Sequence, residues 1–235
     1  MTAEDFSNQF DVLLKTSLSK LSNINYGMDD LSFNEYEKSS YLTQAQDQVV
    51  EAISLGTITG FTNSEIETLL ESITKYEEIN VTDANKTNYI YKPSGYIEYT
   101  INNIFDNKRK ILKEWVLLQT NNDDPCFDYH KLLEVIPIKQ DVYYSTIKNP
   151  FRNSDSLRRV LRVILENGKA LLVSKKPISK YRYSYVVNID PIITYDLQDD
   201  INIENKTTQR TSSLPSMCHR LILELAVNLA INSIK

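Results

Sequence analysis

Glycine is scarce in this chain of 235 residues, which has five, at positions 27, 56, 60, 95 and 168. They are scattered, whereas the loops that bind nucleotide phosphates need clustered glycines. The sequence therefore excludes a phosphate-binding loop and a dinucleotide-binding fingerprint. With 41% hydrophobic and 24% charged residues, the composition is that of an ordinary globular protein with a real core.

Cysteine is equally rare, because Cys126 and Cys218 are the only two and could form at most one disulfide. A disulfide framework is excluded, and a reducing compartment is favoured. The first residues carry acid, at Glu4 and Asp5, where a secretory signal carries Lys or Arg. The longest apolar-rich stretch, 221–234, is interrupted by polar side chains, so we expect no membrane span and folding in a cytoplasm.

Only one group of residues resembles a metal site. Cys126, Asp128 and His130 alternate and would share one face of a strand, and Cys218 with His219 could complete the set. However, neighbouring helix residues point about 100° apart, and the paired spacings of structural zinc sites do not occur. No nucleophile motif occurs either. We expect no metal, no cofactor and no enzymatic activity, and a metal-dependent hydrolase ranks last among three hypotheses.

Charge does not decide between partners. The chain has 26 basic and 31 acidic residues, a net charge of -5, yet several basic residues cluster. One cluster is 108–110 with Lys113, and another comprises Arg152, Arg158, Arg159 and Arg162. On a strand, Arg158 and Arg162 would face one way and Arg159 the other. Such residues can bind phosphate or an acidic partner, or they can protect an edge strand from unwanted pairing, and both interpretations stay open.

The first third of the sequence predicts helices. Apolar residues recur at helical spacing from Phe6 to Leu21. Ser32 is a candidate N-cap for a second helix, with Glu35 in the capping-box position and Gly56 at the end. A third helix should start at Thr62 or Asn63. The predicted apolar stripe of the second helix consists of Phe33, Tyr36, Tyr41, Ala45, Val49 and Ala52.

The middle of the chain predicts short strands, and the C-terminus predicts a helix. The β-rich runs are 89–91, 111–118, 132–138, 157–165, 170–173 and 181–189. Asn167-Gly168 is a hairpin signal, and 139–148 could form a short helix. Short connections favour a mainly antiparallel sheet. The last helix should start at Leu214 or Pro215, with Arg220 and Glu224 in a narrow polar stripe and apolar residues elsewhere. It should pack against the N-terminal helices or a neighbouring subunit.

These elements predict an α+β fold, with N-terminal helices and a long C-terminal helix packed together and a central, mainly antiparallel β region. We expect a single domain over 1–235. Its parts would be helical residues 1–77, a β-rich region at 78–195, a polar loop or arm at 196–213 and the C-terminal helix at 214–235. The 15 tyrosines outnumber the other aromatic residues, which favours an interaction protein because tyrosine suits half-buried contacts.

Three segments together carry a family resemblance. They are 33–47 (FNEYEKSSYLTQAQD), then 149–152 (NPFR) followed by 158–162 (RRVLR), and finally 214–227 (LPSMCHRLILELAV). In this order and spacing the chain resembles the ring or head–tail adaptor proteins of the virion neck of crAss-like bacteriophages. The similarity spans nearly the whole chain. None of the segments is a catalytic motif.

The resemblance implies a structural virion protein, assembled in the bacterial host cytoplasm. It would form a homo-oligomeric ring, a dodecamer, in the head–tail connector below the portal. Its partners would be itself, the portal, other neck or tail ring proteins and the genomic DNA in the central channel, bound without sequence specificity, with no membrane contact. The expected contact residues are Phe33, Tyr36, Tyr41, Arg152, Arg158, Arg159, Arg162, Arg220 and Glu224. The alternative is a free-standing nucleic-acid-binding or regulatory protein that uses the basic strands.

Overall fold

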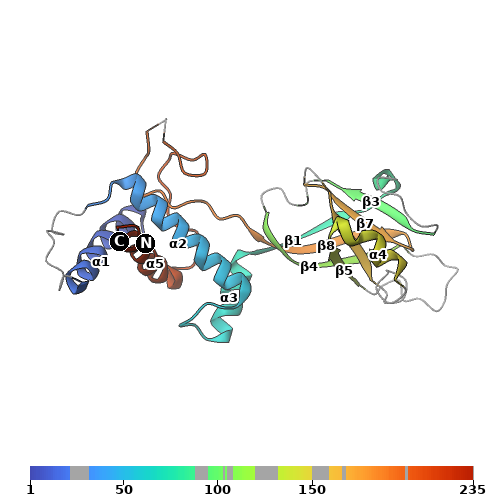
Figure 1. Cartoon of the computed structure of the whole chain (residues 1–235), viewed down its shortest axis with the longest axis horizontal. Helices are drawn as coiled ribbons and strands as arrows, with labels where there is room; N and C mark the ends of the chain where they lie inside the picture. Colours follow the sequence, from blue (N-terminus) through green and yellow to red (C-terminus); the bar gives the residue numbers. More distant parts are fainter. Residues whose placement is uncertain are drawn as a thin grey trace. The chain divides into compact units, whose positions relative to one another are not determined.

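The fold is α+β, as predicted. The structure, a computed structural model, describes residues 1–21, 32–87, 95–102, 104, 108–119, 132–149, 159–165, 168–198 and 201–234. Contacts divide the chain into two compact units, shown in Figure 1. We call Met1–Ile73 with Ile189–Lys235 the helical unit, and Thr74–Asn188 the sheet unit. The hypothesis of a single domain stays a prediction.

The helical unit contains four α-helices among its described residues. These are α1 (Ala3–Leu21), α2 (Glu35–Leu55), α3 (Asn63–Ile73) and α5 (Ser216–Ile234). Helix α5 contacts both α1 and α2 (Figure 1). The N-terminal helices and the C-terminal helix are thus packed together, although they are separated by more than a hundred residues of sequence.

Helix α5 is the most apolar helix of this bundle. Eight of its side chains are buried, whereas Arg220 and Glu224 are exposed on the predicted polar stripe. We predicted that this helix packs against the N-terminal helices or a neighbouring subunit, and the structure shows the packing against the N-terminal helices. By length and composition α5 could also cross a membrane, but this is weak evidence, because the core helix of a globular unit passes the same test.

The ends of α2 follow local rules, although one predicted cap is wrong. Asn34, not Ser32, is the N-cap: its side chain accepts a hydrogen bond from the Glu37 N–H, and Glu37 accepts one from the Asn34 N–H, both at 2.9 Å. The predicted C-terminal stop at Gly56 is confirmed. Its φ of 66° lies in the left-handed region that favours glycine.

The predicted apolar stripe of α2 is only partly right. Ala45 and Val49 are buried, but Tyr36 is exposed, and four polar or charged side chains are buried instead: Lys38, Ser39, Thr43 and Gln46. Lys38 bonds Ser7 and Asp11 on α1, whereas Ser39, Thr43 and Gln46 lie under the segment that returns from the sheet unit. The Ile192 N–H donates to the Thr43 hydroxyl at 3.1 Å, and the Gln46 amide donates to the Asp190 carbonyl at 2.8 Å. Buried polar groups need such partners.

The sheet unit has eight strands among its described residues. They are β1 (Thr74–Asn80), β2 (Lys86–Thr87), β3 (Ile97–Ile101), β4 (Lys108–Leu118), β5 (Leu133–Ile138), β6 (Val160–Ile164), β7 (Ala170–Ser174) and β8 (Ile178–Val187). They form one sheet in the order β1-β8-β4-β5-β6-β7-β3-β2. All neighbouring pairs are antiparallel except β5 and β6, which are parallel. The prediction of a mainly antiparallel sheet is confirmed.

Some strand boundaries differ from the predictions. The helical region was expected to extend to residue 77, but α3 ends at Ile73 and β1 begins at Thr74 because this segment pairs with β8. Strand β3 was not predicted. The hairpin of β6 and β7 is confirmed around Gly168, which has a φ of 70°. The run at 89–91, Asn167, and residues 157 and 158 lie outside the described residues.

The sheet is curled and carries a core on each side. The inner core gathers side chains from β3 to β8, including Tyr99, Val116, Leu133, Leu172 and Tyr181. On the opposite face of β6 and β7, a second core packs under the short helix α4 (Tyr143–Lys148). Tyr143 anchors this helix, and its hydroxyl donates to the buried Glu98 carboxylate at 3.1 Å.

The loop before α5 belongs to the helical unit. Its base is held by mutual backbone hydrogen bonds between Ile193 and Arg210, both at 2.9 Å. Its tip turns at Glu204 and Asn205, which both have positive φ, between Ile203 and Lys206, as in the tight turn of a hairpin. The segment predicted as a polar loop is therefore anchored at its base. Ordering on assembly stays a prediction.

Candidate interaction surfaces

The predicted contact residue Arg162 lies inside the curled sheet. Its Nε is 2.7 Å from Oε1 and 3.0 Å from Oε2 of Glu114, and both residues are buried. Tyr181 donates its hydroxyl hydrogen to the same carboxylate. Strands β6, β4 and β8 thus bring one charge pair and one phenol together. Burial beside this carboxylate raises the pKa of Tyr181. Contact of Arg162 with a partner stays a prediction, which this burial does not support.

A second polar group lies where edge strand β1 meets β8. Glu77 accepts hydrogen bonds from the hydroxyls of Tyr183 and Tyr185, and the ammonium of Lys108 is 3.3 Å from its carboxylate. Burial alone would raise the pKa of Glu77, but these donors outweigh it and lower that pKa. Tyr181, Tyr183 and Tyr185 share one face of β8. The face is the inner one, so these tyrosines serve the core.

The predicted aromatic contact residues of the helical unit divide into packed and exposed ones. The ring of Phe33 lies edge-on to Phe10 and Tyr41, with centroids at 6.1 and 5.4 Å. The Tyr41 hydroxyl is 2.8 Å from the Ser233 hydroxyl on α5. Phe33 and Tyr41 therefore join α1, α2 and α5. Tyr36, by contrast, is 40% exposed.

The remaining predicted contact residues lie apart. Arg220 and Glu224 form an exposed ion pair one helical turn apart, with 2.8 Å between Nε and Oε1. Arg159 is half-buried at the start of β6. Arg152 and Arg158 lie outside the described residues. The structure therefore describes only Arg159 and Arg162 of the predicted arginine cluster. The role of these residues in partner contact stays a prediction.

The described residues supply no metal-binding group of three or more His, Cys, Asp and Glu side chains. Cys126, Asp128 and His130 lie outside them. Cys218 is buried in α5, and burial raises the pKa of its thiol to about 11. The His219 ring is also buried, which lowers its pKa, and its Nε2 is 3.0 Å from the Leu214 carbonyl. Cys218 and His219 thus serve the packing of α5, and His219 also joins the helix to the residue at position 214.

Charge is divided unevenly between the two units. The sheet unit has 19 basic and 13 acidic residues, a net charge of +6. The helical unit has 7 basic and 18 acidic residues, a net charge of -11. The overall value of -5 hides this separation. Copies of such a chain attract one another when unlike units meet.

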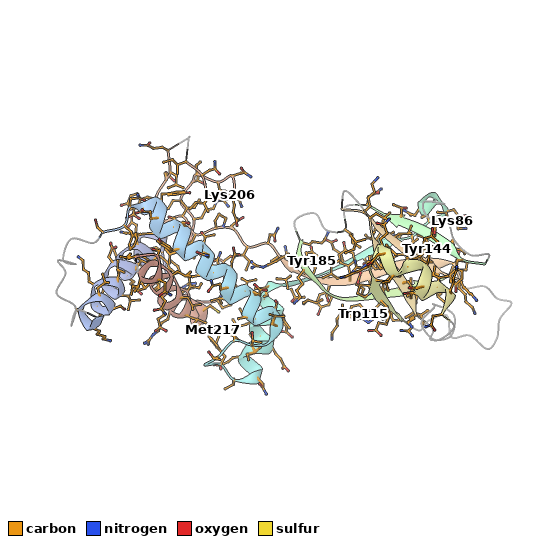
Figure 2. All side chains as sticks on the ribbon, viewed as in Figure 1. Lys86, Trp115, Tyr144, Tyr185, Lys206 and Met217 are labelled. Carbon is orange, nitrogen blue, oxygen red and sulfur yellow. The ribbon has the colours of Figure 1, made fainter. Side chains whose placement is uncertain are left out.

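A groove on the sheet unit was not predicted from the sequence. It has a volume of about 390 Å³ and is lined by Tyr76 and Glu78 on β1, Arg182 and Tyr183 on β8, Trp115 on β4, together with Glu77 and Leu132. Trp115 can be located in Figure 2. Tyr76 is 75% exposed and Leu132 is 42% exposed. Aromatic residues and arginine are enriched at the centres of protein interfaces, so the groove is a candidate docking surface.

Comparison with known proteins identifies the family. A family model described as phage tail ring protein 3/4 matches residues 1–235. Ring protein 3 of Bacteroides phage crAss001 is 32% identical over 238 residues, covering 99% of this chain and 96% of that protein. Ring protein 4/5 of the same phage is 24% identical over 238 residues, covering 98% and 92%. The chain therefore belongs to the phage tail ring protein 3/4 family, a family of structural proteins of the bacteriophage virion.

Proposed function

We propose that this protein forms a homo-oligomeric ring of twelve copies in the head–tail connector of the virion. The ring lies below the portal, contacts neighbouring ring proteins and surrounds the channel through which the genomic DNA passes. The match to ring proteins along almost the full length of the chain carries this proposal. It is a structural role, and the chain needs no cofactor for it.

The division of charge supports assembly into a ring. A closed ring needs a heterologous interface, in which two different surfaces of each copy meet. The acidic helical unit and the basic sheet unit provide two surfaces of opposite sign. A basic unit can also face the DNA channel, where contact with phosphates is independent of sequence. The family membership favours this role over that of a free-standing nucleic-acid-binding protein.

A cryo-EM map of the intact particle tests the proposal. We expect copies of this chain, related by rotational symmetry, around the DNA between the head and the tail. Cross-linking of purified virions should also connect this chain to itself and to its neighbours in the stack. Absence of the chain from mature particles, or its presence there as single copies, would contradict the proposal.

A further inference from the structure

The end of α2 and helix α3 form an apolar and acidic surface, which we call the α3 face. It consists of Leu55, Ile66, Glu67, Leu70 and Glu71. Leu55 is 55% exposed, Ile66 and Leu70 are half-buried, and both glutamates are exposed one turn apart. Helix α3 contacts α2, and its buried residues are Leu69 and Ile73. The other side chains of this short helix are half-buried or exposed.

The part of the chain that contains the α3 face carries only negative charge. Residues 39–73 contain five carboxylates and no Lys or Arg. Glu67 and Glu71 form no ion pair with the residues that the structure describes. The α3 face thus combines exposed apolar side chains with uncompensated negative charge. A surface of this kind fits a partner that offers an apolar groove beside positive charge.

The groove on the sheet unit has these properties. The register of the strands places Trp115, Arg182 and Glu78 side by side on the outer face of the sheet, with Lys113 next to Trp115 along β4. Lys113 is exposed and forms no ion pair with described residues. Glu78 is already paired with both Lys180 and Arg182. The apolar lining is therefore accompanied by a cation that has no ion-pair partner among the described residues.

The outer face around the groove has a surplus of positive charge. Its described charged residues are Lys110, Lys113, Lys180 and Arg182 against Glu78 and Glu134. Among these described residues the positive charges exceed the negative ones by two. This excess matches the two exposed glutamates of the α3 face in number and sign. We define the docking groove as this outer face, with Tyr76, Trp115 and Leu132 as its apolar centre.

We propose that the α3 face of one copy docks into the docking groove of the next copy in the ring. Leu55, Ile66 and Leu70 would cover the apolar centre, and Glu67 and Glu71 would lie near Lys113 and Lys110. The contact is heterologous, so each copy uses both surfaces, and the series closes into a ring when the rotation between copies is a whole fraction of a full turn. This inference rests on the proposed function and names its interface. DNA would match the cations alone and would leave the apolar centre uncovered.

Charge reversal on each surface, followed by mixing, tests this contact. Host cells infected with a phage that lacks the gene receive plasmid-borne copies, and the readout is the number of particles that contain the protein. Lys113→Glu alone and Glu67→Lys alone should each lower that number on the order of tenfold, because every contact in the ring then opposes like charges. The two variants supplied together should restore it. In a mixed ring one contact keeps the native pair and the next has both charges reversed.

Controls separate the interface from folding and from the proposed function. Lys148→Glu, on the exposed side of α4 in the same unit, should leave particle numbers unchanged. Circular dichroism of the purified variants should match that of the native chain, since all these side chains are exposed. Native-like assembly of either variant alone, or no rescue by the mixture, overturns the proposed contact. Failure of the native chain to enter particles would instead contradict the proposed function.

Discussion

Arg162 and Glu114 form a buried ion pair inside the sheet unit, with Nε of Arg162 2.7 Å from Oε1 of Glu114. The two residues come from strands that are not neighbours in the sheet, β6 and β4. The pair therefore spans the inside of the curl. Since both charges have lost their water, each depends on the other to offset the cost of desolvation.

Removal of one partner should destabilise the sheet unit strongly. We expect Glu114→Ala to lower the free energy of unfolding by about 3 kcal/mol, because it leaves the Arg162 guanidinium buried without its carboxylate. Trp115 is the one tryptophan of the chain and lies in this unit, so urea unfolding followed by its fluorescence measures the change. Glu134→Ala, an exposed carboxylate opposite Trp115, should change the value by no more than about 0.5 kcal/mol.

The same pair offers a stricter test. The double variant Glu114→Leu/Arg162→Met replaces both charges by apolar side chains and should recover most of the stability that Glu114→Ala loses. A double variant no more stable than the single one would mean that the carboxylate itself is needed, for example by the Tyr181 hydroxyl.

The helical unit should lose stability in acid through Glu35. The ammonium of buried Lys38 lies 2.6 Å from the Asp11 carboxylate and 3.0 Å from that of Glu35. Burial alone would raise the pKa of Glu35, but hydrogen bonds from Thr194, Lys38 and Ser7 lower it below 4.5. A carboxylate with a lowered pKa stabilises the fold above its unfolded pKa. The stabilisation is therefore present above pH 4.5 and disappears as the pH falls through the lower, folded value.

Lys38→Met tests this network. It should destabilise the helical unit by about 1 to 2 kcal/mol, since the carboxylate partners are more than a third exposed and partly screened by water. It should also shift acid unfolding, followed by circular dichroism at 222 nm, to higher pH. Lys15→Met, an exposed lysine on α1, serves as the control. An unchanged acid transition in Lys38→Met would show that Glu35 does not set it.

The buried polar residues of α2 should contribute more to stability than the exposed polar residues of the same helix. Gln46 donates to the Asp190 carbonyl at 2.8 Å and accepts from the Ser212 hydroxyl at 2.6 Å. Gln46→Ala removes one buried and one partly buried hydrogen bond, so we expect the free energy of unfolding, from heat or urea, to fall by about 2 kcal/mol. Gln48→Ala, exposed on the same helix, should have an effect within about 0.5 kcal/mol. Equal effects would mean that the returning segment does not need these bonds.

Local signals in the sequence located most of the elements. The spacing of Phe6, Phe10, Leu14 and Leu18 indicates α1, and all four side chains are buried. Gly56 indicates the end of α2, because few other residues adopt the left-handed backbone conformation found there. These features depend on residues within one or two turns of each other, so a single sequence contains enough information to predict them.

Long-range contacts determine the features that sequence reasoning missed. Ser39, Thr43 and Gln46 look like surface residues, but they are buried because the segment around Ile192 returns across α2. The sequence around Arg162 indicates a surface cation, but in the structure this residue is buried and paired with Glu114. Periodicity along the chain contains no information about a partner far away in the sequence.

The docking groove was missed for the same reason. Tyr76, Trp115 and Arg182 are separated by dozens of residues and become neighbours only because β8 pairs with both β1 and β4. The excess of tyrosine favoured an interaction protein, but four of the 15 tyrosines, Tyr181 and Tyr183 among them, belong to the inner core of the sheet.

The two units allow a test of the single-domain hypothesis. Each unit has helices or strands packed around its own core, so separate cooperative transitions are possible. Fluorescence of Trp115 follows the sheet unit, whereas circular dichroism at 222 nm follows mainly the helical unit. Two transitions that do not coincide in urea would contradict the single-domain hypothesis. Coincidence of the two curves would support one cooperative domain over 1–235.

The predicted contact residues of the helical unit should separate into two classes by their effects on stability and assembly. Phe33→Ala should cost about 2 kcal/mol in unfolding, because it removes the ring contacts with Phe10 and Tyr41. Arg220→Ala should change the free energy of unfolding by no more than about 0.5 kcal/mol, since the side chain is exposed.

If Arg220 contacts a partner, the Arg220→Ala chain should fold normally and yet enter particles in lower numbers than the native chain. The matched control is Lys20→Ala, another exposed cation of the same unit, on the last turn of α1. Chemical unfolding measures the first effect, and quantification of the protein in purified virions measures the second. Native numbers for Arg220→Ala would remove Arg220 from the set of contact residues, because an exposed side chain that affects neither stability nor assembly has no structural role in the ring.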